Sequence, residues 1–207
     1  MSPLREKGAF NPADRTGSSE DPFFCPSVSR LLLCSPAVVL FTLYSHSANR
    51  SFLNYNLEGI PSILSPELLF ALAKMGHGDE LVLADTNFPT SSICSCGPIE
   101  IRADGLRAPE LLEAILKLLP LDTYVPSPAA VMELVDSDKQ NGLATPVWEI
   151  FRQNLTRAGV HAPLEEVERF AFYERAKKAF AVVATGETAL YGCLILKKGI
   201  IPAHQLD

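Results

Sequence analysis

The chain has 207 residues, of which 47% are hydrophobic and 20% are charged, a composition typical of a globular protein. Its net charge of -6, with no stripe rich in lysine and arginine, argues against a nucleic-acid-binding surface. The length predicts one domain with an appendage, and a domain of about 150 residues buries enough surface to fold without disulfides.

The first 58 residues differ in composition from the rest. They are polar and rich in Pro, Ser and Gly as far as Arg30, and a largely apolar stretch of 14 residues follows at 31–44. That stretch is shorter than a membrane span of about 20 residues, Pro36 interrupts it, and it lies too deep for a signal peptide. We expect a poorly ordered extension over 1–58, a folded domain over 59–207, and no membrane partner. A targeting or membrane-touching segment is the alternative.

A helix and two short strands are predicted at the start of the domain. Ser65-Pro66-Glu67 has a capping serine, a proline suited to the first turn and an acid near the positive helix end. Apolar residues at helical spacing follow, and Gly76 is typical of the position after a helix. The continuous apolar run 81–84 predicts a buried strand, and residues 99–102 predict another strand.

Helical and β-rich segments continue to alternate through the second half. The predicted helices lie at 109–119, 128–134 and 146–158, with a helical turn at 173–178, and the predicted strands lie at 180–184 and 190–196. This alternation indicates a layered α/β/α domain with a central, mainly parallel sheet, in which sites lie beyond the carboxyl ends of strands. No glycine-rich phosphate-binding motif is present, so no nucleotide cofactor is expected.

Five cysteines are present, and their odd number without a regular framework favours a reducing compartment such as the cytoplasm. They are Cys25, Cys34, Cys94, Cys96 and Cys193. Cys94-Ser95-Cys96 is not a CxxC redox motif and lacks the second Cys or His pair of a zinc site, so we expect loop thiols and no metal.

His77 is the first candidate for chemistry, because it stands between two glycines and ahead of two acids. Histidine titrates near neutral pH and suits general acid–base work, and flanking glycines allow a ligand to approach closely. The alternative is a structural histidine that bonds a carbonyl at a helix end. Asp85 directly follows a predicted strand, and Asp122 follows a predicted helix; either is also consistent with an ordinary loop acid or cap.

Two tyrosines, Tyr173 and Tyr191, complete the candidates, because phenols bind sugar hydroxyls and act as weak acids. Tyrosine is equally common in strands and cores. Taken alone, these residues indicate an α/β domain with an acid–base pocket and nothing more specific.

Five ordered segments resemble the fucose mutarotase branch of the family that also contains the ribose pyranases. They are MGHGDELVLADTNFP (75–89), IEIRADGL (99–106), LDTYVPSPAAVMELV (121–135), FYERAKKAFAVVATGE (172–187) and ALYG (189–192). The resemblance covers about residues 59 to 200. It implies interconversion of the α and β anomers of L-fucose without a cofactor, in a ring-like homo-oligomer whose site lies at a subunit interface.

The resemblance also implies roles for single residues. His77 would be the proton donor, with Asp122 and Tyr173 as the other catalytic residues. The implied sugar contacts are Asp85, Met132, Tyr173, Tyr191 and the position of Cys193. At that last position the family typically has Asn, which binds a sugar better than a thiol does. Three alternatives remain: a sugar-binding or regulatory protein without turnover, a ribose pyranase-type enzyme, and a structural ring protein.

Overall fold

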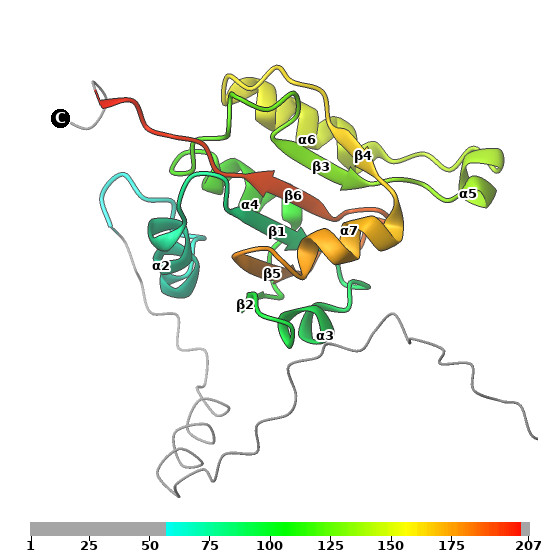
Figure 1. Ribbon diagram of the computed structural model, residues 1–207, viewed down its shortest axis with the longest axis horizontal. Helices are drawn as coiled ribbons and strands as arrows, with labels where there is room; N and C mark the ends of the chain where they lie inside the picture. Colours follow the sequence, from blue (N-terminus) through cyan, green and yellow to red (C-terminus); the bar gives the residue numbers. More distant parts are fainter. Residues whose placement is uncertain (1–56, 204–207) are drawn as a thin grey trace, which may run out of the picture. The chain divides into compact units, whose positions relative to one another are not determined.

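The computed structural model describes residues 57–203, so the predicted extension over 1–58 lies outside the described residues except for its last two. The last four residues of the predicted domain also lie outside. The described part contains a six-stranded sheet in the order β2-β5-β1-β6-β3-β4 (Figure 1). Its strands are β1 (Glu80–Ala84), β2 (Ile99–Ala103), β3 (Ala129–Met132), β4 (Glu165–Val167), β5 (Ala181–Thr185) and β6 (Leu194–Lys197).

Helices cover both faces of this sheet. They are α2 (Pro66–Lys74), α3 (Thr90–Cys94), α4 (Ala108–Ile115), α5 (Asp136–Gln140), α6 (Pro146–Arg157) and α7 (Arg169–Ala176). Residues of α2, α4 and α6 belong to one buried cluster, and residues of α3 and α7 belong to a second. Leu81 and Leu83 of β1 join the first cluster while Val82 joins the second, because successive side chains of a strand point to opposite faces. The predicted α/β/α layering is confirmed.

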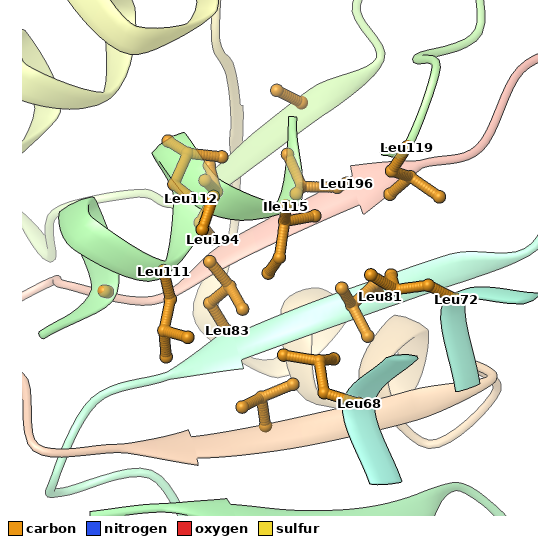
Figure 2. Packing of buried hydrophobic residues seen from close by; sticks show 14 of the residues in the cluster. Leu68, Leu72, Leu81, Leu83, Leu111, Leu112, Ile115, Leu119, Leu194 and Leu196 are labelled. Carbon is orange, nitrogen blue, oxygen red and sulfur yellow. The ribbon is translucent and has the colours of Figure 1, made fainter. Parts of the chain in front are cut away.

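The larger cluster lies between β1, β6 and the helices α2 and α4. Figure 2 shows its centre, where Leu68, Leu72, Leu81, Leu83, Leu111, Leu112, Ile115, Leu119, Leu194 and Leu196 pack together. A strand buried on both faces reads as a continuous apolar run, which is why the sequence of β1 predicted its place correctly.

The sheet is mainly parallel, as predicted. β1 and β2 each pair in parallel with β5, and β3 pairs in parallel with β4. β6 is the exception, because it runs antiparallel to both of its neighbours, β1 and β3. β6 therefore begins at the end of the sheet where β1 finishes, and it finishes where β1 begins. We call the end at which β1 begins the amino end, and the opposite one the carboxyl end.

Local signals account for the start of α2. The Ser65 hydroxyl accepts a hydrogen bond from the Leu68 N–H at 3.2 Å, and Pro66 occupies the first turn. At the start of α7, the carboxylate of Glu168 accepts hydrogen bonds from the N–H groups of Phe170 and Ala171. The predicted helical turn at 173–178 overlaps the last part of this longer helix, which ends at Ala176.

The helix predicted over 128–134 is wrong. Ala129–Met132 forms β3, which pairs with β4 and β6, and all four of its residues are buried. Alanine, methionine and leucine favour helices, but packing on both faces of a central strand outweighs that preference. The strand predicted over 190–196 is shorter, because Tyr191 has a left-handed backbone with φ of 58° and β6 starts only at Leu194.

In the part of the chain that the structure describes, no helix is long and apolar enough to cross a membrane.

Candidate functional site

His77 lies on a tight corner between α2 and β1. Gly78 has φ of 86°, a conformation that residues with a Cβ rarely adopt. The Gly76 N–H donates to a carboxylate oxygen of Asp79 at 2.6 Å, which closes the turn. The His77 side chain is 50% exposed. The corner therefore presents the imidazole to solvent at the amino end of the sheet.

Asp122 lies beside His77 although 45 positions separate them in the chain. Its Oδ2 atom is 3.5 Å from Nε2 of His77, and its side chain is only 5% exposed. Its Oδ1 accepts a hydrogen bond from the Tyr124 N–H at 2.9 Å, the geometry of an Asx turn. This N–H, together with His77 and Lys197, holds the pKa of Asp122 below its ordinary value, although burial opposes the shift.

We call His77 and Asp122 the amino-end pair. The exposed ring of Tyr124 approaches the imidazole edge-on, with 6.1 Å between ring centroids and 71° between the planes. Tyr124 was not among the residues predicted from the sequence. The only feature of the sequence that could have indicated it is its position two residues after Asp122. A charged carboxylate next to an accessible imidazole can orient the ring and stabilise its protonated form.

The other predicted residues lie at the carboxyl end. Asp85 follows β1 directly, is buried, and accepts a hydrogen bond from the Asn87 N–H at 2.9 Å. Its own N–H donates to Sγ of Cys193 at 3.3 Å. Met132 and Cys193 belong to the second buried cluster, and Tyr173 and Tyr191 pack against it. We call Asp85, Met132, Tyr173, Tyr191 and Cys193 the carboxyl-end group.

Two members of this group, the phenol of Tyr173 and the thiol of Cys193, have raised pKa values. Burial raises the pKa of the Tyr173 phenol, and the negative charges that Cys193 and Asp85 can carry raise it further. Burial also raises the pKa of the Cys193 thiol well above its ordinary value, with Asp85 adding to the shift. Near neutral pH both groups are therefore protonated, and Tyr173 is a hydrogen-bond donor.

Tyr191 is held from several sides. Its hydroxyl donates to Oδ2 of Asp138 at 2.5 Å and accepts from the Val135 N–H at 3.3 Å. Its carbonyl accepts from the Trp148 indole N–H at 2.9 Å. The hydroxyl of Tyr191 is therefore already engaged, both as a donor and as an acceptor.

Glu187 belongs to the same loop and was missed as a candidate. It is 1% exposed, and its carboxylate accepts hydrogen bonds from Arg107 at 3.2 Å and from the Ala189 N–H at 2.8 Å. Its carbonyl accepts from the Thr86 N–H at 2.9 Å. Glu187 thus links two segments: the loop that contains Tyr191, and the turn that follows Asp85. No spacing or motif in the sequence indicated this buried acid.

A cavity of about 490 Å³ opens beside Asp85, among the ends of β1, β5 and β2. This volume is within the usual range for small-molecule sites. Hydroxyl and charged side chains contribute to its lining, among them Thr86, Thr90, Arg102 and Asp104. Asp85 is the one member of the carboxyl-end group that lines it. No cluster of three or more His, Cys, Asp or Glu side chains suited to a metal ion occurs among residues 57–203.

The amino-end pair and the carboxyl-end group lie at opposite ends of β1. That strand has five residues and spans roughly 16 Å, since a strand rises about 3.3 Å per residue. The expectation that sites lie beyond the carboxyl ends of strands fits Asp85 and the residues around it, but not His77 and Asp122. Within one chain, a bound monosaccharide can therefore contact only one of the two.

Comparisons with a family model and with known proteins indicate the same family. The model of the RbsD / FucU transport protein family matches residues 58–201. The fucose mutarotase of Homo sapiens is 71% identical over 150 residues, which cover 72% of this chain and 97% of the relative. The L-fucose mutarotase of Glaesserella parasuis is 50% identical over 147 residues, covering 70% of this chain and 97% of that protein.

Solved structures agree with the sequence comparisons. The fucose mutarotase of Streptococcus pneumoniae, in complex with L-fucose, matches with a TM-score of 0.63 and 46% identity, over 70% of this chain and 99% of that one. RbsD of Bacillus subtilis, complexed with D-ribose, has a TM-score of 0.51 at 19% identity, over 67% of this chain and 95% of that one, which is a likeness of fold alone. The resemblance seen in the five sequence segments is confirmed, and the chain belongs to the RbsD / FucU transport protein family.

Proposed function

We propose that this protein is an isomerase that interconverts the α and β anomers of L-fucose. The observation that carries the proposal is the charged, buried Asp122 placed 3.5 Å from the exposed imidazole of His77, in a chain 71% identical to a fucose mutarotase. A pair of this kind delivers and removes protons near neutral pH.

The reaction needs two proton transfers in each direction. Ring opening requires a proton on the ring oxygen and the loss of one from the anomeric hydroxyl, and closure on either face of the aldehyde reverses both steps. His77 donates the proton to the ring oxygen, and Asp122 stabilises the charged imidazole. The protonated phenol of Tyr173 donates a hydrogen bond to the anomeric oxygen, and the proton that this oxygen loses passes to a water molecule. Each positioned transfer contributes roughly 10²–10⁴-fold in rate, and neither step needs a cofactor.

A complete site requires two copies of the chain. The amino-end pair of one copy meets the carboxyl-end group of the next, which makes a head-to-tail contact that closes into a ring. Exposed apolar side chains near both groups support this assembly. Tyr124 is 74% exposed beside His77, while Phe170 and Leu190 are 50% and 57% exposed beside Tyr173 and Tyr191.

The activity is tested by exchange NMR on the anomeric protons of L-fucose. The protein should accelerate α–β exchange, and His77→Ala should abolish the acceleration because the proton donor is lost. His161→Ala, which removes an exposed histidine far along the chain, is the matched control and should retain full activity. A wild-type protein without acceleration, or a fully active His77→Ala variant, would refute the proposal.

The shared site is tested by mixing two impaired variants. His77→Ala and Tyr173→Phe should each be impaired alone, because each damages every site. Co-assembled in equal amounts, they should restore about one site in four, in which the intact groups come from different copies. No recovery in a mixed assembly that has the wild-type size would exclude a site formed by two copies.

A sugar-binding protein without turnover is the second candidate, favoured by Cys193 at the position where the family typically has Asn. Tight binding of L-fucose with no acceleration of exchange would support it. A panel of sugars that includes D-ribose distinguishes a ribose pyranase-type activity. We also infer a reducing compartment such as the cytoplasm, because the five cysteines of the sequence form no regular disulfide framework.

A further inference from the structure

His77 and Asp122 belong to different segments of the chain. The backbone next to His77 and that of Asp122 both form hydrogen bonds with residues 197–198, at the end of β6. The Gly78 N–H donates to the Lys198 carbonyl and the Lys198 N–H to the Asp79 carbonyl, each at 2.9 Å. On the other side, the Asp122 N–H donates to the carbonyl of Lys197 at 3.0 Å. The backbone at 197–198 therefore lies between the His77 corner and the Asp122 turn and bonds to both.

The side chain of Lys198 adds a second attachment to the same corner. Its Nζ donates to the Leu72 carbonyl at 3.1 Å and also to the Met75 carbonyl. The last carbonyls of a helix have no partner within the helix, and the negative end of the helix dipole favours a cation. The Leu72 carbonyl would normally bond the Gly76 N–H, but that N–H donates to Asp79. The ammonium group of Lys198 replaces the Gly76 N–H as the donor to the Leu72 carbonyl, at the end of α2 where the His77 corner begins.

We propose that Lys198 is a positioning residue for proton transfer by His77. Its ammonium group fixes the end of α2, its backbone fixes Gly78 and Asp79, and the imidazole is thereby held against Asp122. Lys198 acts on His77 through the backbone on either side of it, at Met75 and at Gly78. The proposal rests on the proposed role of His77 and adds a residue that determines the geometry of the pair. Small misplacements matter, since a shift of about 1 Å can reduce a rate about 100-fold.

The test compares Lys198→Met with Lys74→Met. Lys74 lies in the last turn of the same helix with its Nζ 5.2 Å from the Phe70 ring centroid, so its loss removes the same charge from the same helix end. Lys198→Met should lower kcat for L-fucose exchange about 10- to 100-fold with KM changed less than about twofold. Lys74→Met should leave both constants unchanged, and Lys198→Arg should recover most of kcat.

A spectroscopic measurement separates positioning from a general loss of stability. The edge-on ring of Tyr124 shifts the resonances of the His77 ring protons, so their chemical shifts report where the imidazole lies. In folded Lys198→Met these shifts should move toward those of an unstructured histidine. If Lys198→Met does not fold, Lys198→Gln, which keeps one donor, takes its place and should show the same changes in smaller size.

Two results would overturn the proposal: a kcat equal to that of Lys74→Met, or a reduced kcat with unchanged His77 shifts. Failure of the proposed function is distinguishable, because a wild-type protein that does not accelerate exchange refutes the mutarotase activity. The His77 shifts of the variants still decide whether Lys198 holds the imidazole in place.

Discussion

Replacement of Cys193 by asparagine should increase the affinity for L-fucose and lower the thermal stability of the sugar-free protein. The thiol is 2% exposed, and its sulfur accepts the Asp85 N–H at 3.3 Å. An amide oxygen at this position accepts the same N–H as a stronger acceptor than sulfur. The amide nitrogen is then left to donate to a sugar hydroxyl, which a thiol does only weakly.

The size of both effects follows from this burial. A new hydrogen bond contributes about 0.5–1.5 kcal/mol, which corresponds to an affinity about two- to tenfold higher. Without sugar, the buried amide N–H group has no partner, and an unpaired buried donor costs about 1–3 kcal/mol. In a domain of this size such a loss lowers Tm by about 2–12 °C.

Calorimetric titration with L-fucose and thermal unfolding with and without the sugar measure the two effects. The Cys193→Asn variant should show a lower Tm alone and a larger rise in Tm when saturated with the sugar. Cys94→Asn, at the end of α3, is the control for a thiol outside the carboxyl-end group and should leave affinity unchanged. A Cys193→Asn variant that binds no more tightly and melts like wild type would refute the reasoning.

Three further changes test the fold and the amino-end pair. Phe151→Ala removes a fully buried side chain of α6 and should lower the free energy of unfolding by about 3–5 kcal/mol in urea titrations; a loss below about 1 kcal/mol would contradict the packing. Asp122 has a lowered pKa in the folded state, so its charge stabilises the protein above the ordinary carboxyl pKa, and this contribution disappears as pH falls through the lowered value. The Tm difference between wild type and Asp122→Asn should therefore shrink as pH falls from about 7 to about 3, and a constant difference would contradict it. Gly199→Ala would place a Cβ 2.4 Å from the Leu121 carbonyl oxygen, so it should cost about 1–3 kcal/mol in thermal unfolding and reduce exchange activity; full activity at wild-type stability would show that the Asp122 turn adjusts freely.

The elements that local signals specify were predicted correctly from the sequence. Ser65 and Pro66 define the start of α2, and the apolar run 81–84 matches β1 closely, because capping and burial on both faces leave a local pattern. β3 was mistaken for a helix because its residues are helix formers, and only its partners β4 and β6 make it a strand.

The sequence indicated the candidate residues of the site, but it did not indicate how all of them lie relative to one another. The glycines around His77 indicated an unusual corner, and the structure confirms one. That Asp122 lies at this corner depends on hydrogen bonds to Lys197 and Lys198, far along the chain, which leave no local signal. The separation of His77 from Asp85, in contrast, follows from the apolar run 81–84 itself, because the two residues flank that strand in the sequence.

The direction of β6 limits how the length of this part of the chain can vary. The segment from Cys193 to Lys198 runs through the middle of the sheet and bonds to the Asp85 turn at one end and to the His77 corner at the other. Deletion or insertion of a single residue here would turn every following side chain to the opposite face and shift the register with both neighbours. Functional relatives should therefore differ in the residues of this segment but not in their number, whereas the chain from the exposed Ile200 and Ile201 onward is free to vary in length.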